Sequence, residues 1–362
     1  MKHTFWMVPL VLLALLAAGC ARTNPDPPPP PDENQPISQD PDSSLAWSPE
    51  QPAGVIYRCE AVGEGRYLLL YQDLLYTSQD PSQPPEYRDT LCLYEPETGL
   101  FAPLAEEEHL FHGYDDQMIL TDDALLYNSG GIRLLSFAWD GQTLVKTDRT
   151  KDPYDYCSVS PDGERYALRR DEVVEIFSMK DDRKLAELPG ALNVGRICWS
   201  PSGAWLAMVE NGLITLWCPG EGTVRRLSEE ELGVPEGWVD IFGIFFVNGD
   251  RFLVVDYMTE TGGALCLWDM ERGERLLCME EEGDITVLDI RGSMVLYEVA
   301  PRKGGPHTLE IADFRAMDLE TRTVDTGDVF YTAGVLLDDF GQVLVSCFDL
   351  ESRSNRLAVL GA

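Results

Sequence analysis

Basic residues are scarce in this chain. Lysine and arginine together number 28, against 62 aspartates and glutamates, so the formal net charge of the 362 residues is −34. A polyanion of this size repels phosphate backbones and anionic lipid headgroups, which excludes nucleic acid as a partner. Basic ligands, metal cations and neutral glycans stay compatible with this charge.

The motifs of nucleophilic and metal-dependent catalysis are also missing. The sequence contains no G-x-S-x-G, no H-E-x-x-H and no zinc spacing of cysteines and histidines. Of the four histidines, His109 and His112 follow three glutamates at 106–108, which favours a solvated acidic loop over a cation site. His307 follows a glycine-rich loop, so we expect it to face solvent. We therefore assign no catalytic residue, no metal site and no cofactor.

Nine cysteines are present, but none belongs to a C-x-x-C pair. Most lie among apolar residues of expected strands, where a free cysteine behaves as a small hydrophobic residue. Cys266 and Cys278 flank a hairpin at residues 271–273 and could face each other across it. Because the sequence leaves the register uncertain by one residue, it is compatible both with a disulfide between them and with two free thiols.

No apolar run is long enough to cross a bilayer as a helix, which takes about 20 residues. The run at residues 5–18 has only 14, contains Pro9 and follows the basic Lys2. A basic start, a short apolar stretch and small residues before a cleavage point predict an export signal over residues 1–19. The alternative, a membrane-spanning helix, is disfavoured by the length of the run.

The small residues Ala18 and Gly19 end directly at Cys20, and there the segment resembles a bacterial lipoprotein signal peptide. Ala17 departs from the leucine that this family prefers at its position. The resemblance implies that Cys20 is lipidated and anchors the chain to the cell membrane or the outer membrane, on the extracytoplasmic face. Ordinary secretion and a retained membrane anchor are the alternatives.

Proline dominates the next segment. Residues 20–44 contain five consecutive prolines at 27–31, among aspartate, asparagine, glutamine and serine. Such a segment cannot bury a core and favours extended polyproline II, so we expect a disordered tether of up to about 70 Å. A partner that recognises proline is the alternative reading of this segment. The folded domain then covers residues 45–362.

In that domain, short apolar runs alternate with Gly- and Asp-rich turns at a recurring spacing. The clearest units contain Ser160-Pro161-Asp162-Gly163 and Ser200-Pro201-Ser202-Gly203 between two apolar strands. Proline presets φ and glycine accepts a positive φ, so both sequences are typical of tight turns. Weaker copies lie at Glu64-Gly65, Asp122-Asp123, Asn248-Gly249, Arg291-Gly292 and Phe340-Gly341.

Four strands per unit, repeated about seven times, predict an all-β fold, a β-propeller with seven four-stranded blades. The two Ser-Pro turns resemble those of TolB-type propellers, and Trp268-Asp269 resembles the dipeptide of WD repeats. The regular histidine and aspartate of true WD blades are not visible, which favours the TolB-like class. A pair of β-sandwiches and a parallel β-helix are the alternatives, and the weak turn at Asp122-Asp123 leaves the blade number open by one.

The last unit ends one strand short. It supplies strands near residues 335–337, 342–348 and 356–360 only. Because a propeller has to close its ring, we expect the segment Leu45-Ala46-Trp47 to supply the missing outermost strand.

One face of such a ring collects the connections that enter each innermost strand and those between second and third strands. On this register the face carries aromatic residues beside carboxylates, which suits sugars or cationic peptides. The candidate ligand-binding residues are Asp115, Asp116, Tyr154, Asp155, Trp238, Asp240, Tyr257, Asp284 and Arg302, with Glu260 beside them. An acidic rim that only keeps the protein soluble is the alternative.

These features predict a lipid-anchored, extracytoplasmic and non-catalytic propeller that binds or scaffolds a protein partner in the cell envelope. TolB-like propeller lipoproteins are interaction platforms, and the resemblance implies that role. A receptor for a small ligand, either a glycan or a peptide, is the first alternative. An enzyme that acts on glycans through carboxylates at the mouth of the channel is the second.

Overall fold

A computed structural model describes most of the chain after residue 45. The described residues are 46–47, 55–63, 65–76, 86–107, 117–129, 133–147, 156–170, 172–191, 194–316, 318–327, 329–337, 341–349 and 354–361. The expected signal peptide, Cys20 and the tether lie outside these ranges. Within the ranges, no helix is long and apolar enough to span a bilayer.

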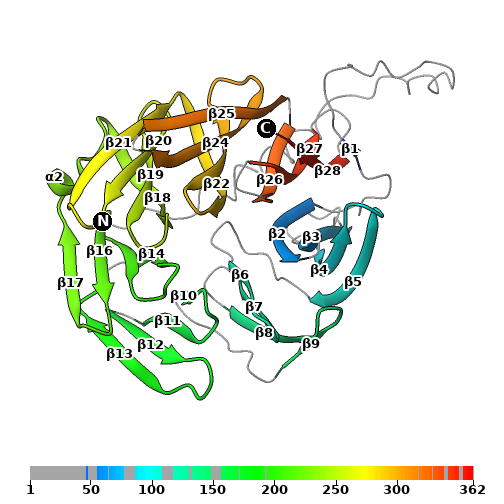
Figure 1. The fold of residues 1–362 in the computed structure, drawn as a ribbon, viewed down its shortest axis with the longest axis horizontal. Coiled ribbons are helices and arrows are strands. Elements are labelled where there is room, and N and C mark those ends of the chain that lie inside the picture. The colour runs from blue at the N-terminus through cyan, green and yellow to red at the C-terminus, as the bar shows by residue number, and fades with distance from the viewer. Residues whose placement is uncertain are drawn as a thin grey trace. The chain divides into compact units, whose positions relative to one another are not determined.

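The described strands form seven antiparallel sheets of four strands, which we number as blades 1 to 7 (Figure 1). Blade 1 consists of β2 (Val55–Gly63), β3 (Arg66–Tyr76), β4 (Glu86–Glu95) and β5 (Leu100–Glu107). Blade 2 consists of β6 (Gln117–Leu120), β7 (Ala124–Ser129), β8 (Arg133–Trp139) and β9 (Leu144–Lys146). Blade 3 consists of β10 (Tyr156–Val159), β11 (Arg165–Arg170), β12 (Val173–Ser178) and β13 (Lys184–Pro189).

The remaining blades follow the same order. Blade 4 consists of β14 (Val194–Trp199), β15 (Leu206–Glu210), β16 (Leu213–Cys218) and β17 (Thr223–Leu227). Blade 5 consists of β18 (Trp238–Val247), β19 (Phe252–Thr259), β20 (Gly263–Asp269) and β21 (Glu274–Glu281). Blade 6 consists of β22 (Gly283–Arg291), β23 (Met294–Pro301), β24 (His307–Ala316) and β25 (Asp318–Gly327). Blade 7 consists of β26 (Val329–Leu336), β27 (Val343–Asp349), β28 (Ser354–Leu360) and β1 (Ala46–Trp47).

The innermost strand of each blade contacts the innermost strand of the next blade, and the contact between β26 and β2 completes the ring (Figure 1). The predicted seven-bladed β-propeller is therefore confirmed, and the β-sandwich and β-helix alternatives are wrong. The expected closure is confirmed too. Strand β1 pairs with β28, with Ala46 opposite Val359, so the segment before the first blade completes the last one.

The turns found in the sequence all connect the first strand of a blade with its second. In blade 3, the Ser160 Oγ accepts a hydrogen bond from the Arg165 backbone N–H at 3.0 Å, and Gly163 adopts a φ of 68°. A side chain at Gly163 would be strained by this φ, which explains the glycine. These short-range interactions fold each turn locally, and the local signal made the blades visible in the sequence.

The core lies between the blades. Among the described residues, buried apolar side chains form seven clusters, and each cluster joins two neighbouring blades. In β3, Leu68 and Leu70 pack toward blade 2, whereas Tyr67 and Leu69 pack toward blade 7. Successive side chains of a strand point to opposite faces of its sheet. A sheet buried on both faces therefore needs apolar residues at consecutive positions, which these strands have.

One short helix lies among the described residues, α2 (Glu229–Leu232), between blades 4 and 5. Ser228 caps it: the Ser228 Oγ accepts from the Glu231 backbone N–H, and the Glu231 carboxylate accepts from the Ser228 N–H at 2.9 Å. This reciprocal capping box stabilises a single turn that would be marginal alone. The buried Trp268 donates through Nε1 to the Glu231 carbonyl at 3.2 Å, which fixes the helix on blade 5.

Candidate functional site

Two faces of the ring differ in what they carry. We call the turn face the one with the turns between first and second and between third and fourth strands of each blade. The loop face carries the connections between blades and between second and third strands. The candidate ligand-binding residues of the sequence belong to the loop face, and four of them (Asp115, Asp116, Tyr154 and Asp155) lie outside the described residues.

Asp284 and Arg302 form an ion pair on the loop face. The Arg302 Nε donates to the Asp284 carboxylate at 2.6 Å, and its terminal nitrogens donate to the carbonyls of Glu260 at 2.8 Å and Gly262 at 3.3 Å. Glu260 and Gly262 belong to blade 5, whereas Asp284 and Arg302 belong to blade 6. Arg302 therefore ties two blades together, and its donors are occupied by the protein itself.

Trp238 and Tyr257 pack together at the edge of blade 5, with ring centroids 6.2 Å apart in an edge-to-face arrangement. Only 1% of Tyr257 is exposed, so its ring offers no surface on which a ligand could stack. Its hydroxyl is buried without a hydrogen-bond partner, and burial raises the pKa of the phenol. Asp240 accepts a hydrogen bond from the Ile241 backbone N–H at 2.8 Å. The exposed aromatic face expected here therefore reduces to Trp238, which is half-buried.

His307 is buried, contrary to the expectation from the glycine-rich loop before it. Only 8% of the residue is exposed, its Nδ1 lies 2.7 Å from the Glu298 Oε1, and its ring packs edge-on against Phe330. The same carboxylate oxygen accepts from the Tyr331 backbone N–H at 3.1 Å. The expectation failed because His307 is the first residue of β24, whose side chain points into the seam with blade 7 instead of the loop.

Cys266 and Cys278 lie directly opposite each other on β20 and β21, with Cα atoms 4.0 Å apart, and form a disulfide. Of the two arrangements compatible with the sequence, the structure has the bridged one. The other described cysteines are outside this disulfide and lie inside or beside the core. No group of three or more His, Cys, Asp or Glu side chains that could hold a metal ion occurs in the described part of the chain.

Two partly buried acids, Glu60 and Asp289, lie on innermost strands of the ring. Burial and the neighbouring Asp289 raise the pKa of Glu60 to about 8, while Arg58 acts in the opposite direction. Burial also raises the pKa of Asp289 to about 6, although the Leu336 backbone N–H donates to its carboxylate at 2.7 Å. Glu60 lies on β2 and Asp289 on β22, the innermost strands on either side of blade 7.

Two exposed apolar residues mark the wall of the channel. Val239 is 54% exposed and Phe242 is 37% exposed, and both lie where the register between β18 and β19 shifts. A β-bulge inserts one extra residue into a strand and re-aims its side chain. The Arg196 guanidinium lies 5.9 Å from the centre of the Phe242 ring, which links the innermost strands of blades 4 and 5.

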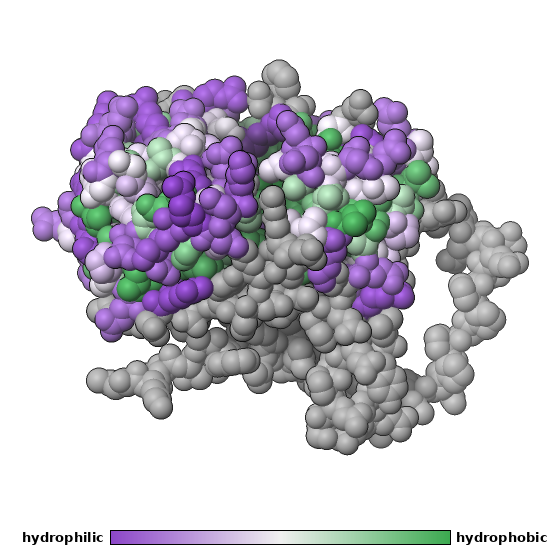
Figure 2. Space-filling model, turned by 90° about the horizontal axis from the view of Figure 1, so that it is seen from below, coloured by the Kyte–Doolittle hydropathy of each residue, from purple (hydrophilic) through white to green (hydrophobic). Residues whose placement is uncertain are grey.

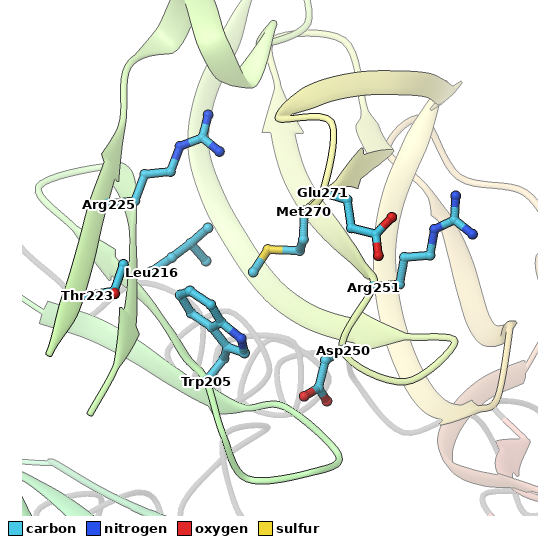
Figure 3. A pocket seen from close by; sticks show the side chains of 8 residues that line it. All are labelled: Trp205, Leu216, Thr223, Arg225, Asp250, Arg251, Met270 and Glu271. Atoms are coloured by element: carbon cyan, nitrogen blue, oxygen red, sulfur yellow. The ribbon is translucent and has the colours of Figure 1, made fainter. Parts of the chain in front are cut away.

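A pocket of about 380 Å³ opens on the turn face, between blades 4 and 5 (Figure 3). Its apolar floor consists of Trp205, Leu216 and Met270. Its rim consists of Thr223, Arg225, Asp250, Arg251 and Glu271. Trp205 and Met270 approach each other in the centre, while Arg225 and Arg251 lie on opposite sides (Figure 3).

Three of the four charged groups of this rim, Asp250, Arg251 and Arg225, have partners within the protein, and Glu271 brings the rim to two positive and two negative charges. The Asp250 carboxylate accepts from the backbone N–H of Ser202 at 3.1 Å and from its hydroxyl. Arg251 lies 3.6 Å from the buried carboxylate of Asp269. Arg225 lies 3.3 Å from the Glu231 carboxylate and covers the Trp268 ring at 4.9 Å. The site is therefore electrically balanced.

The candidate residues of the sequence lie on the loop face, so they do not indicate this pocket. Two signals were present: the Ser200-Pro201-Ser202-Gly203 turn ends beside Trp205, and Trp268-Asp269 precedes Met270. In the sequence alone, both are markers of the repeat. Nothing in the sequence shows that the two turns meet, because they belong to different blades.

No family model matches the sequence, and a comparison with curated proteins found no match. Among solved structures, a chain of the "Crystal Structure of Mitotic Checkpoint Complex" is similar, with a TM-score of 0.58 at 12% sequence identity. The similarity covers 95% of this chain and 99% of that chain. At this identity it shows the β-propeller fold alone.

Proposed function

We propose that this protein is a lipid-anchored, extracytoplasmic β-propeller that binds a protein partner and does not catalyse a reaction. The fold supports the binding role, since propellers commonly serve as interaction scaffolds and the similar solved chain comes from a protein complex. The anchor rests on the lipoprotein-like segment that ends at Cys20.

The observation that carries the proposal is an arc of exposed apolar side chains on the rim of the ring. The outermost strands of four consecutive blades each expose one: Leu100, Val145, Leu185 and Val224, at 53, 62, 44 and 37%. In the side view of Figure 2, small hydrophobic areas lie between hydrophilic ones. Outermost strands also present unpaired backbone groups, so this arc of blades 1 to 4 offers both apolar and hydrogen-bonding contacts to a partner.

The described mouth residues support a non-catalytic role. Hydrolysis of a glycan needs two carboxyl groups that face one substrate, one as acid and one as base or nucleophile. Here Asp284 is held by Arg302, and Asp240 by the Ile241 N–H. Each carboxylate is engaged within its own blade, an arrangement that suits structure better than proton transfer.

Site-specific photo-cross-linking in the native membrane tests the partner. We would place a photoreactive amino acid at position 145 or 185 of the full-length chain, and at position 239 as a control of similar exposure on the innermost strand. We expect one stoichiometric protein adduct from the rim positions and none from position 239. Absence of any adduct would overturn the proposal, and thermal stabilisation by small glycans or peptides would then identify a receptor.

The anchor has its own test. Metabolic labelling with a clickable fatty acid should label the wild-type protein and leave Cys20→Ala unlabelled. Export of an unlabelled wild-type protein into the medium would show ordinary secretion instead.

A further inference from the structure

We infer that the pocket between blades 4 and 5 binds one large apolar side chain, aromatic or aliphatic, from a segment of the protein partner. This inference rests on the proposed function, because it names the place on the propeller where the partner is anchored. It adds a contact on the turn face to the rim of blades 1 to 4, whereas the sequence pointed to the loop face.

The floor of the pocket fits such a side chain. Trp205, Leu216 and Met270 present an indole, a branched alkyl group and a thioether to the same space. Tryptophan and methionine are enriched in protein interfaces, and the flexible thioether adapts to differently shaped neighbours. A volume of about 380 Å³ is at the lower end for small-molecule sites, and it accommodates one large side chain with its backbone neighbours.

The charges of the rim select a neutral occupant. Asp250 is satisfied by Ser202, Arg251 faces Asp269 and Arg225 faces Glu231, so no buried charge of the pocket awaits an opposite charge from a ligand. The pocket therefore binds its occupant mainly through apolar contacts. In a chain with a net charge of −34, a site where two arginines balance the acids also lets another protein approach with little repulsion.

The pocket is preformed. The hydrogen bonds from Ser202 to Asp250 join the first turn of blade 4 to the first turn of blade 5. Arg225, from the outermost strand of blade 4, covers Trp268 of blade 5. These contacts hold both walls of the pocket in place without a ligand. Binding therefore costs conformational entropy only in the incoming side chain, which favours binding.

N-acetyl-L-phenylalaninamide is the probe, measured by saturation-transfer NMR on the full-length chain in detergent micelles. It carries one apolar side chain and two neutral amides, as a residue within a peptide does. We expect a dissociation constant of about 1–10 mM, typical of a ligand of this size. N-acetyl-L-aspartic acid α-amide, benzoate and glucose should bind at least about tenfold more weakly, because the floor of the pocket is largely apolar and the charges of its rim balance one another.

Two variants locate the binding. Trp205→Ala should weaken the probe by about tenfold or more, since truncation of a central aromatic residue commonly costs that much. Thr223→Trp fills the pocket from an exposed rim position, so it should abolish binding with an unchanged melting temperature even if Trp205→Ala is destabilised. Phe242→Ala, an exposed aromatic residue on the channel wall, is the matched control and should bind the probe like the wild type.

Equal binding of the probe to the wild type and to Thr223→Trp would overturn the inference, as would no binding at 20 mM probe, well above the expected constant of about 1–10 mM. Preferential binding of benzoate or glucose would overturn it in favour of a small-ligand site. Failure of the proposed function is a separate result: the photo-cross-linking would find no protein while the probe still bound in a Trp205-dependent manner. If a partner is cross-linked and retained equally by Thr223→Trp, the pocket inference alone fails.

Discussion

Trp47 pairs with Ala358 at the outer edge of blade 7, so the beginning and the end of the folded domain share one sheet. Each of blades 1 to 6 is built from one continuous segment of the chain. Blade 7 differs, because its outermost strand comes from the other end of the folded domain. Opening this pair exposes the outer edge of β28 and separates the two ends of the chain. This strand pairing involves only Ala46 and Trp47, and it reinforces the closure that the contact between β26 and β2 makes at the centre of the ring.

We predict that deletion of residues 44–50 lowers the melting temperature by about 5 °C or more, because it removes the closing strand. Thermal unfolding followed by circular dichroism measures this. A deletion of equal length in the proline-rich segment, residues 27–33, is the control and should leave the melting temperature unchanged. An unaltered melt of the first variant would show that β1 does not close the ring.

The blades and, to within one, their number were predictable because their signals are local. A turn such as Ser160-Pro161-Asp162-Gly163 folds through contacts within six residues, and its apolar flanks mark two strands. The closing strand was predictable by counting, since the last unit had three strands where the others had four. Neither argument requires knowing which side chains of neighbouring blades contact each other.

The sequence could not show which side chains meet at the interfaces between blades. Trp205 and Met270 meet in one pocket although 65 positions separate them, and Glu60 and Asp289 become neighbours only when the ring closes. His307 shows the same limit on a small scale: the loop before it indicated exposure, but the alternation of β24 turned its side chain inward. Contacts between neighbouring blades depend on the strand register of both sheets. A turn motif does not specify that register.

The Cys266–Cys278 disulfide closes a loop with a sequence separation of 12. By the loop-entropy relation, a bridge of this size stabilises the fold by up to about 3 kcal/mol. We predict that a reductant lowers the midpoint of urea unfolding accordingly and that Cys278→Ser reproduces the loss and abolishes the response to reductant.

Thiol counting provides the independent check. Alkylation of the unfolded but unreduced chain should leave Cys266 and Cys278 unlabelled and label the six described cysteines outside the disulfide, Cys59, Cys92, Cys157, Cys198, Cys218 and Cys347. Labelling of Cys266 before reduction would show that the bridge is absent from the protein in solution.

Stability should fall as the pH rises from about 5 to 9. Burial raises the pKa of Glu60 to about 8 from its ordinary value of 4.5, so the folded state holds a proton that the unfolded state has lost. This contribution is complete below pH 4.5 and is lost progressively as the pH rises through 8. Asp289, with a pKa raised to about 6, and Asp256, with a pKa raised to about 7, act in the same direction.

Glu60→Gln is the variant that tests this, because it keeps the shape and removes the proton equilibrium. We expect its melting temperature to fall less steeply between pH 6 and pH 9 than that of the wild type, by a few degrees over the range. Asp140→Asn is the control: hydrogen bonds from Thr143 and Gln142 lower the pKa of this exposed carboxyl, so its effect is confined to acid pH. Parallel slopes for Glu60→Gln and wild type would contradict the assignment.

Glu298 stabilises the interface between blades 6 and 7 through buried hydrogen bonds. Its Oε1 lies 2.7 Å from the His307 Nδ1 and accepts from the Tyr331 N–H at 3.1 Å, and all three residues are buried. Glu298→Ala leaves the Tyr331 N–H and the histidine without an acceptor, which should cost about 2–4 kcal/mol of unfolding free energy. Glu298→Gln retains a carbonyl oxygen at the same place and should lose less.

Urea unfolding measures both variants, with the exposed Glu282→Ala as the control. We expect Glu298→Ala to be the least stable, Glu298→Gln to be intermediate and the control to equal the wild type. If Glu298→Ala unfolded at the wild-type midpoint, the buried hydrogen bonds to His307 and Tyr331 would not contribute to the seam.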